Sequence, residues 1–271
     1  MSWLGLVAGL LSATVFGLAA VAQAHAVRRF ADRPDSLVGF VSLSVRDAWT
    51  MAVVAAYLLG FLLHAVAIWL LPLYLAQATV AMSLPVTAWA ARRVDAALAA
   101  RHWAAVGTVT LGLVLLSLGA GAPGEVVTTP LFTALLWAAV LGLLVAALLL
   151  HDSPGGLLGT LAGLGYAGSA IAVRGVETPV SAVVVLAALA VPSFSLVAFW
   201  VYSLGMRGGA VAAATAPMIV GQTFVPSVVG VALLGDGVRG GWWPVVVAGL
   251  LLSTAGAVAL ARQESEVALP G

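Results

Sequence analysis

Long apolar runs, separated by short polar stretches, dominate the chain. A membrane-spanning helix needs about 20 predominantly apolar residues, and charged residues, proline and glycine mark where such runs end. The pattern predicts nine spanning helices, near Trp3–His25, Trp49–Leu70, Leu73–Ala91, Trp103–Leu118, Leu131–Leu150, Gly156–Val173, Val180–Leu204, Ala210–Leu234 and Trp242–Ala261. The apolar stretch Ser36–Val45 is too short to cross a bilayer, so we interpret it as an interfacial or re-entrant segment.

The first predicted helix raises the question of a cleaved signal peptide. Ala22-Gln23-Ala24 has the small residues of a cleavage site. However, no positive charge precedes the apolar run, and the run is longer than the apolar region of a signal peptide. We therefore expect this helix to be retained as a span.

The composition supports an all-α, polytopic membrane protein. Hydrophobic residues make up 63% of the chain and charged residues 8%, with a mean hydropathy of +1.15. A typical soluble domain has about 25% charged residues. The composition therefore excludes a cytosolic enzyme, a disordered chain and a nucleic-acid binder. The absence of cysteine also removes disulfides and thiolate metal sites.

The arginines predict how the protein is oriented. With nine spans, the connections alternate between the two sides, and arginine concentrates on the cytoplasmic side of membrane proteins. One side carries only Arg174 and Arg239. The other side carries nine arginines: Arg28, Arg29, Arg33, Arg46, Arg92, Arg93, Arg101, Arg207 and Arg262. We expect a multi-pass protein of the cell inner (cytoplasmic) membrane, with its N-terminus outside and its C-terminus in the cytoplasm.

Two halves of the chain share an internal pattern. Pro85 and Pro226 lie 141 residues apart, as do Asp95 and Asp236. The pattern predicts a first transmembrane repeat (1–119), a linker with the fifth helix (120–155), a second repeat (156–262) and a short cytoplasmic tail (263–271). The odd linker helix makes the two repeats inverted, an arrangement that transporters use to open alternately to either side.

These motifs resemble the drug/metabolite transporter superfamily. The first half carries Leu71-Pro72-Leu73-Tyr74-Leu75-Ala76-Gln77, Pro85, Asp95 and Trp103, and the second carries Ala216-Pro217, Gln222, Pro226, Gly235-Asp236 and Trp243. Nine spans with an outward N-terminus are similar to the NIPA-type magnesium transporter branch, whereas the EamA-type branch usually has ten. The resemblance implies a helical transporter with a central cavity between the repeats, and it implies no particular substrate.

The positions of the carboxylates argue against a buried cation site. All of them fall in predicted connections or at helix ends: Asp32, Asp35, Asp47, Asp95, Glu125, Asp152, Glu177, Asp236, Glu264 and Glu266. A divalent-cation path prefers anionic oxygen ligands, and cation exporters use a membrane-embedded carboxylate. Backbone and amide carbonyls can also coordinate a cation, so magnesium stays open as a substrate.

The polar and aromatic residues within the predicted helices are the candidates for substrate binding. They are Gln23, His64, Gln77, Tyr166, Trp200, Tyr202 and Gln222. The only titratable group predicted near mid-membrane is His64, which suits proton coupling or a hydrogen bond to substrate, or else simply links two helices. The glutamine amides can equally bind a polar ligand or link helices, and the aromatic rings can stack on a substrate or pack.

The prolines within helices are candidate hinges or static kinks. They are Pro85, Pro192, Pro217 and Pro226. Each removes one backbone hydrogen bond, and the freed carbonyl is tolerated only beside protein or a cavity. Arg174 lies at the end of the sixth predicted helix, and three roles are open for it. It attracts an anionic headgroup, it extends its side chain to the membrane surface, or it pairs with Glu177.

The leading functional hypothesis is a secondary transporter. It would move a small neutral, zwitterionic or amphiphilic solute across the membrane by alternating access. The alternatives are a NIPA-type magnesium or divalent-cation transporter and a flippase for a lipid-linked substrate. We expect no enzymatic activity, cofactor, metal site or nucleic-acid partner. Membrane lipid and the substrate are the expected partners, and proton coupling and a homodimer stay open.

Overall fold

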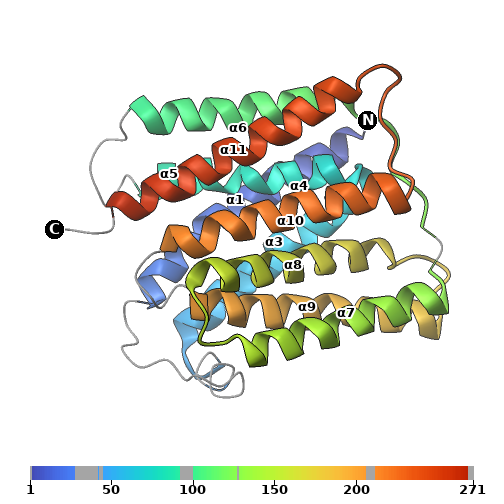
Figure 1. Ribbon diagram of the computed structural model, residues 1–271, viewed down its shortest axis with the longest axis horizontal. Helices are drawn as coiled ribbons and strands as arrows, with labels where there is room; N and C mark the ends of the chain where they lie inside the picture. Colours follow the sequence, from blue (N-terminus) through green and yellow to red (C-terminus); the bar gives the residue numbers. More distant parts are fainter. Residues whose placement is uncertain are drawn as a thin grey trace.

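The structure, a computed structural model, describes residues 2–27, 42, 45–91, 100–126, 128–205 and 211–267 (Figure 1). Within these ranges the regular secondary structure is helical, apart from one isolated β-bridge between Ala120 and Val238. The helices are α1 (Trp3–Val27), α3 (Ala48–Leu70), α4 (Leu73–Ala81), α5 (Ser83–Ala91), α6 (Ala100–Gly119), α7 (Pro130–Leu149), α8 (Gly155–Arg174), α9 (Ala182–Gly205), α10 (Val211–Leu233) and α11 (Trp243–Val267).

The helices and their surfaces identify a helical membrane protein. Among the described residues, four helices are long and apolar enough to cross a bilayer, namely α3, α7, α8 and α9. Large apolar side chains lie exposed on the outside of the bundle, including Leu59, Leu135 and Leu149. Soluble monomers rarely expose extended apolar surface, and a lipid environment removes that cost.

The helices coincide with the segments that the apolar runs predict, with one difference. The predicted helix Leu73–Ala91 is divided at Met82 into α4 and α5. Pro85 has no N–H to donate to the carbonyl of Ala81, four residues earlier, so the α-helical bonding is interrupted there. The Met82 N–H instead bonds to Thr79 O at 3.1 Å and makes a tighter turn. The predicted interfacial segment Ser36–Val45 lies outside the described residues, apart from Ser42 and Val45.

Local capping fixes where two of these helices begin. The Asp47 side chain accepts a hydrogen bond from Thr50 N at 2.8 Å at the start of α3. The Thr129 hydroxyl accepts from Phe132 N at 3.1 Å at the start of α7, which Pro130 opens. Both caps satisfy backbone N–H groups that have no partner in the first turn.

Glycines let the central helices approach closely. A Cβ at Gly159 would overlap the carbonyl oxygen of Ala214, and one at Gly163 would lie 2.6 Å from the carbonyl oxygen of Met218, so α8 packs directly on the backbone of α10. A Cβ at Gly112 of α6 would collide with the backbone at Ser253 of α11. Close backbone packing of this kind is how helices associate in lipid, where burial of apolar surface gives little driving force.

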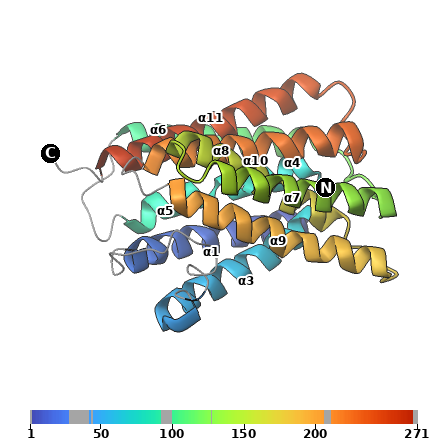
Figure 2. The same ribbon diagram turned by 60° about the horizontal axis from the view of Figure 1, so that its bottom comes forward.

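The helices run roughly side by side, and their connections lie at two ends of the bundle. In Figures 1 and 2, α6 lies beside α11, and α7 lies with α8 and α9. The connections 71–72, 120–129, 175–181 and 234–242 lie at the end drawn on the right in Figure 1. We call this the low-arginine end, because the arginines in or next to these connections are Arg174 and Arg239.

Candidate functional site

A polar pair lies inside the bundle between α3 and α4. The Nε2 atoms of His64 and Gln77 are 3.4 Å apart, and the two residues are buried. A glutamine amide nitrogen donates, so His64 Nε2 is the acceptor in this orientation of the amide. Within the described part of the chain, that Nδ1 has no hydrogen-bond partner. The pair therefore links two helices and leaves one buried ring nitrogen for a further polar group.

Three tyrosines come from three helices that pack together where the first half of the chain contacts the second. Tyr57 is in α3, Tyr166 in α8 and Tyr202 in α9, and α8 packs against both α3 and α9. The Tyr57 ring also lies 6.0 Å from that of Phe16 and 6.3 Å from that of Phe199, measured between centroids. We call Tyr57, Tyr166 and Tyr202 the tyrosine cluster.

The tyrosine cluster contains two residues that the sequence singled out and one that it did not. All three members keep part of their surface accessible. Tyr57 precedes His64 by two helical turns, so the two side chains lie on the same face of α3. That spacing from His64 is the one signal in the sequence that could have pointed to Tyr57, which was not among the predicted candidates.

The remaining predicted binding residues are not shown to join this cluster. Trp200 is buried in the hydrophobic core, and within the described residues its Nε1 has no acceptor. Gln222 lies in α10 and is half-buried. Gln23 lies in α1, but its side chain falls outside the described part of the structure.

The predicted prolines lie in three helices. Pro85 is in the first turn of α5, Pro192 is inside α9, and Pro217 and Pro226 are inside α10. Since a proline cannot donate to the carbonyl four residues before it, Pro226 removes the helical partner of the Gln222 carbonyl. The bundle therefore contains backbone oxygens outside the regular helical pattern.

A buried ion pair lies at the low-arginine end. Arg174 NH2 lies 2.5 Å from the Asp236 Oδ1, and the two side chains are 4% and 0% exposed. The expectation that Arg174 extends to the surface or pairs with Glu177 is therefore wrong. Arg174 ends α8 and Asp236 follows α10, and close packing of these two helices brings both residues to the same place.

The turn after α10 directs Asp236 back into the protein. Gly235 has a φ of +75°, a conformation that side chains other than glycine rarely adopt. The Asp236 N–H then bonds to Gly230 O at 2.9 Å. Gly230 has no side chain, and a Cβ there would collide with the Asp236 Oδ2. Two glycines thus position one carboxylate.

The ion pair binds the backbone of two other connections. Asp236 Oδ2 accepts from Leu73 N at 2.6 Å, and Oδ1 accepts from Gly124 N at 2.8 Å. Arg174 donates to Gly124 O at 2.9 Å and to Leu71 O at 3.1 Å. The N-cap residue of α4 is Pro72, whose side chain cannot accept a hydrogen bond from the first turn. The Asp236 carboxylate, 163 residues further along the chain, accepts from Leu73 N and so takes the place of that cap. We call these five residues the Arg174–Asp236 network.

A second layer of hydrogen bonds lies beside this network. Ala120 pairs with Val238 as an isolated antiparallel bridge, flanked by Gly121 N to Gly237 O at 3.2 Å and Arg239 N to Gly119 O at 3.0 Å. The Tyr74 hydroxyl donates to Gly237 O at 2.9 Å. The connections 120–126 and 234–239 are therefore held to each other and to α4.

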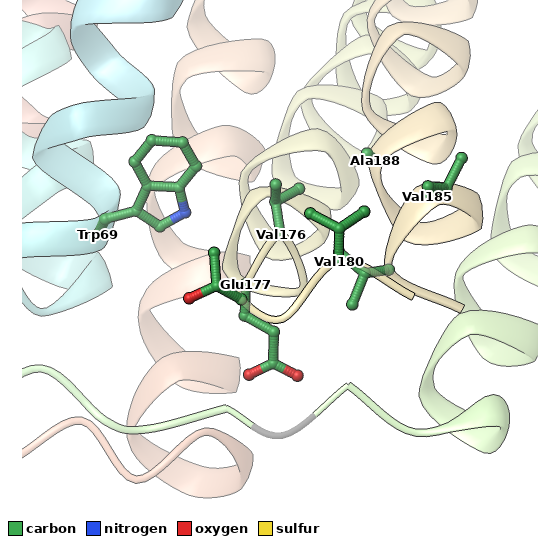
Figure 3. A pocket seen from close by; sticks show the side chains of 8 residues that line it. Trp69, Val176, Glu177, Val180, Val185 and Ala188 are labelled. Carbon is green, nitrogen blue, oxygen red and sulfur yellow. The ribbon is translucent and has the colours of Figure 1, made fainter. Parts of the chain in front are cut away.

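An apolar pocket of about 410 Å³ opens at the same end, between the end of α3 and the start of α9 (Figure 3). Trp69, Val176, Val180 and Val185 line it. The Glu177 carboxylate points away from the Trp69 ring in Figure 3, and it accepts from Thr128 N at 2.5 Å. The pocket thus presents apolar surface, with its one carboxylate already bonded elsewhere.

Comparisons with protein-family models, with curated proteins and with solved structures found no match. The described residues contain no group of three or more histidine, aspartate or glutamate side chains able to hold a metal ion together. The class of the protein therefore rests on its fold, which is that of a helical membrane protein with several apolar helices, an aromatic interior site and a charged network at one end.

Proposed function

We propose that this chain is a secondary transporter that moves a small neutral, zwitterionic or amphiphilic solute by alternating access. The observation that carries the proposal is a helix packing pattern that occurs in both halves. In the first half, α1 packs on α3, α4 and α5, and α4 packs on α6. In the second half, α8 packs on α9 and α10, and α10 packs on α11. These matched contacts support inverted repeats over 1–119 and 156–262, with α7 as the linker helix.

The proposed topology has nine spans, with α4 and α5 forming one of them. The low-arginine end lies outside, and the C-terminus lies in the cytoplasm, as the arginine distribution favours. Inverted repeats related in this way give two similar conformations that open to opposite sides. The sequence motifs that resemble those of drug/metabolite transporters favour the same mechanism.

The tyrosine cluster and the His64–Gln77 pair form the proposed substrate site. Their helices, α3 and α4 on one side and α8 and α9 on the other, belong to the two halves that move in alternating access. Aromatic faces and phenol hydroxyls bind apolar and neutral polar groups. Described carboxylates lie at helix ends or in connections, which favours a solute without a net positive charge.

Magnesium transport is the second candidate, because prolines free backbone carbonyls within α10 and beside α5. Purified protein in liposomes that enclose a magnesium indicator separates the two candidates. Saturable magnesium entry that needs the protein would establish the cation and refute the organic solute. Without magnesium entry, a thermal-stabilisation screen of metabolites and lipid-linked compounds follows, and each stabilising compound is tested for uptake. Correctly inserted protein that takes up none of them would refute the proposal.

A further inference from the structure

We propose that the Arg174–Asp236 network is a latch that closes the low-arginine end and opens during the transport cycle. The inference rests on the proposed function, which requires each end of the bundle to open in turn. The network joins a break in the first half at Leu71–Leu73, the linker at Gly124, and the second half at Arg174 and Asp236. The Tyr74 hydroxyl of α4 joins the same three parts, through Gly121 N and Gly237 O, but it carries no charge.

The two charged side chains of the network are buried in this conformation. The Asp236 side chain has no exposed surface, and Leu73, which packs beside it at the start of α4, is fully buried. The paired connections 120–126 and 234–239 add a second layer of contacts. The conformation described here is therefore closed at the low-arginine end.

The chemistry of the network suits a contact that breaks and re-forms. A buried ion pair gains attraction in a low-dielectric interior, but both charges lose their hydration, and the two terms are of similar size. When the end opens, water returns to both charges, so the open state recovers much of what the broken contacts lose. Four of the five bonds of the network also run to backbone atoms, three of them in connections (Leu71 and Gly124) and one at the first residue of α4 (Leu73). Within the described residues, the Arg174 Nε has no hydrogen-bond partner. The guanidinium therefore lacks one of its possible hydrogen bonds even in this closed conformation.

The natural absence of cysteine gives a direct test. The reporter is Leu73→Cys in the full chain, and the probe is a membrane-impermeant cationic methanethiosulfonate added to spheroplasts. We expect slow labelling of this reporter. Adding Asp236→Asn should raise its labelling rate at least about tenfold, because the unpaired Arg174 charge then favours the hydrated, open state. Arg174→Lys keeps the charge but loses the forked contacts, so it should give a smaller rise.

Two matched variants control for position and access. Glu177→Gln removes a carboxylate at the same end that bonds to Thr128 N and not to Arg174, and it should leave labelling of the reporter unchanged. Gly240→Cys lies exposed in the connection 234–242 with open space around its Cβ position, so it should label rapidly in every background.

Each other outcome overturns a specific claim. Unchanged reporter labelling in folded Asp236→Asn protein would overturn the latch, as would rapid labelling of Leu73→Cys alone. If both latch variants fail to fold in gel filtration, the network is a structural cap and the latch proposal fails. Labelling does not depend on a substrate. A latch that opens in protein without flux would therefore refute the proposed function alone, and flux with an unresponsive reporter would refute the latch alone.

Discussion

Asp236 shows how a single residue gains its role from partners far along the chain. In the sequence it is one of several carboxylates at helix ends. In the folded chain its two oxygens meet Arg174, Leu73 N and Gly124 N. A buried carboxylate is tolerated when a positive charge and hydrogen-bond donors replace its lost hydration, and here both are present.

Replacing this carboxylate should therefore destabilise the protein. Asp236→Asn leaves Arg174 buried without its counter-charge, and breaking a buried pair in this way costs about 3–5 kcal/mol. We expect a clearly lower midpoint of thermal unfolding in detergent, followed by fluorescence-detected gel filtration. Glu177→Gln, the matched change at the same end, should shift the midpoint much less. Equal shifts in the two variants would show that the ion pair contributes no special stability.

His64 is the residue at which proton coupling can be tested. Its ring bonds Gln77, and its buried Nδ1 has no hydrogen-bond partner among the described residues. We predict that His64→Ala leaves the protein folded but abolishes transport or its dependence on pH, because the imidazole of His64, buried beside Gln77, is a side chain that can take up and release a proton. The measurement is initial uptake across a pH series. Ser203→Ala is the control, because the buried Ser203 hydroxyl bonds only within its own helix, to Phe199 O. Uptake with an unchanged pH profile would make His64 structural.

At the scale of elements, the connections 120–126 and 234–239 pair with each other. A prediction of helices alone does not include this contact. Gly121 N and Arg239 N donate on either side of the Ala120–Val238 pair, which makes it a non-hydrogen-bonded antiparallel pair. Residues in such a pair have Cα atoms about 4.5 Å apart. That separation falls within the range of about 4.4–6.8 Å found in disulfides.

Two cysteines introduced there should form a disulfide. We expect Ala120→Cys combined with Val238→Cys to oxidise readily, and the loss of reactivity toward a polyethylene-glycol maleimide reports the bond on a gel. Ala120→Cys combined with Gly240→Cys is the control, two residues out of register, and it should stay reactive. A control pair that oxidises as fast as the test pair would contradict the described register.

At the scale of the whole molecule, the proposed orientation gives a test independent of any substrate. A tag at the C-terminus should be reachable only from the cytoplasmic side, while Gly240→Cys should react with impermeant reagents only from outside. The physical reason is the retention of arginine-rich connections in the cytoplasm. The nine-span topology places one span, α11, between Gly240 and the C-terminus. If the tag and the Gly240→Cys label were accessible from the same side, that topology would be refuted.

The sequence determined the membrane class and the positions of the helices. In lipid, a helix satisfies its backbone hydrogen bonds within one segment, so an apolar run specifies a helix locally. The capping residues Asp47 and Thr129 act within three residues and are equally local. The sequence also identified Tyr166, Tyr202, His64 and Gln77 as candidates. Polar side chains such as those of His64 and Gln77 are costly to place in lipid, and tyrosine rings can bind a substrate, so these residues stood out in the sequence. Neither property shows which residues lie near one another in the fold.

Only the tertiary structure decided the partners. Arg174 and Asp236 are 62 residues apart, and Asp236 and Leu73 are 163 apart. Nothing within one helix specifies such a contact, because it depends on how closely α8 and α10 pack and on the turn at Gly235. The same reason explains why Tyr57 was missed, since it joins Tyr166 and Tyr202 only when α3 lies against the second half. Local hydrogen bonding fixed the elements, and glycine-mediated packing between distant helices fixed the site.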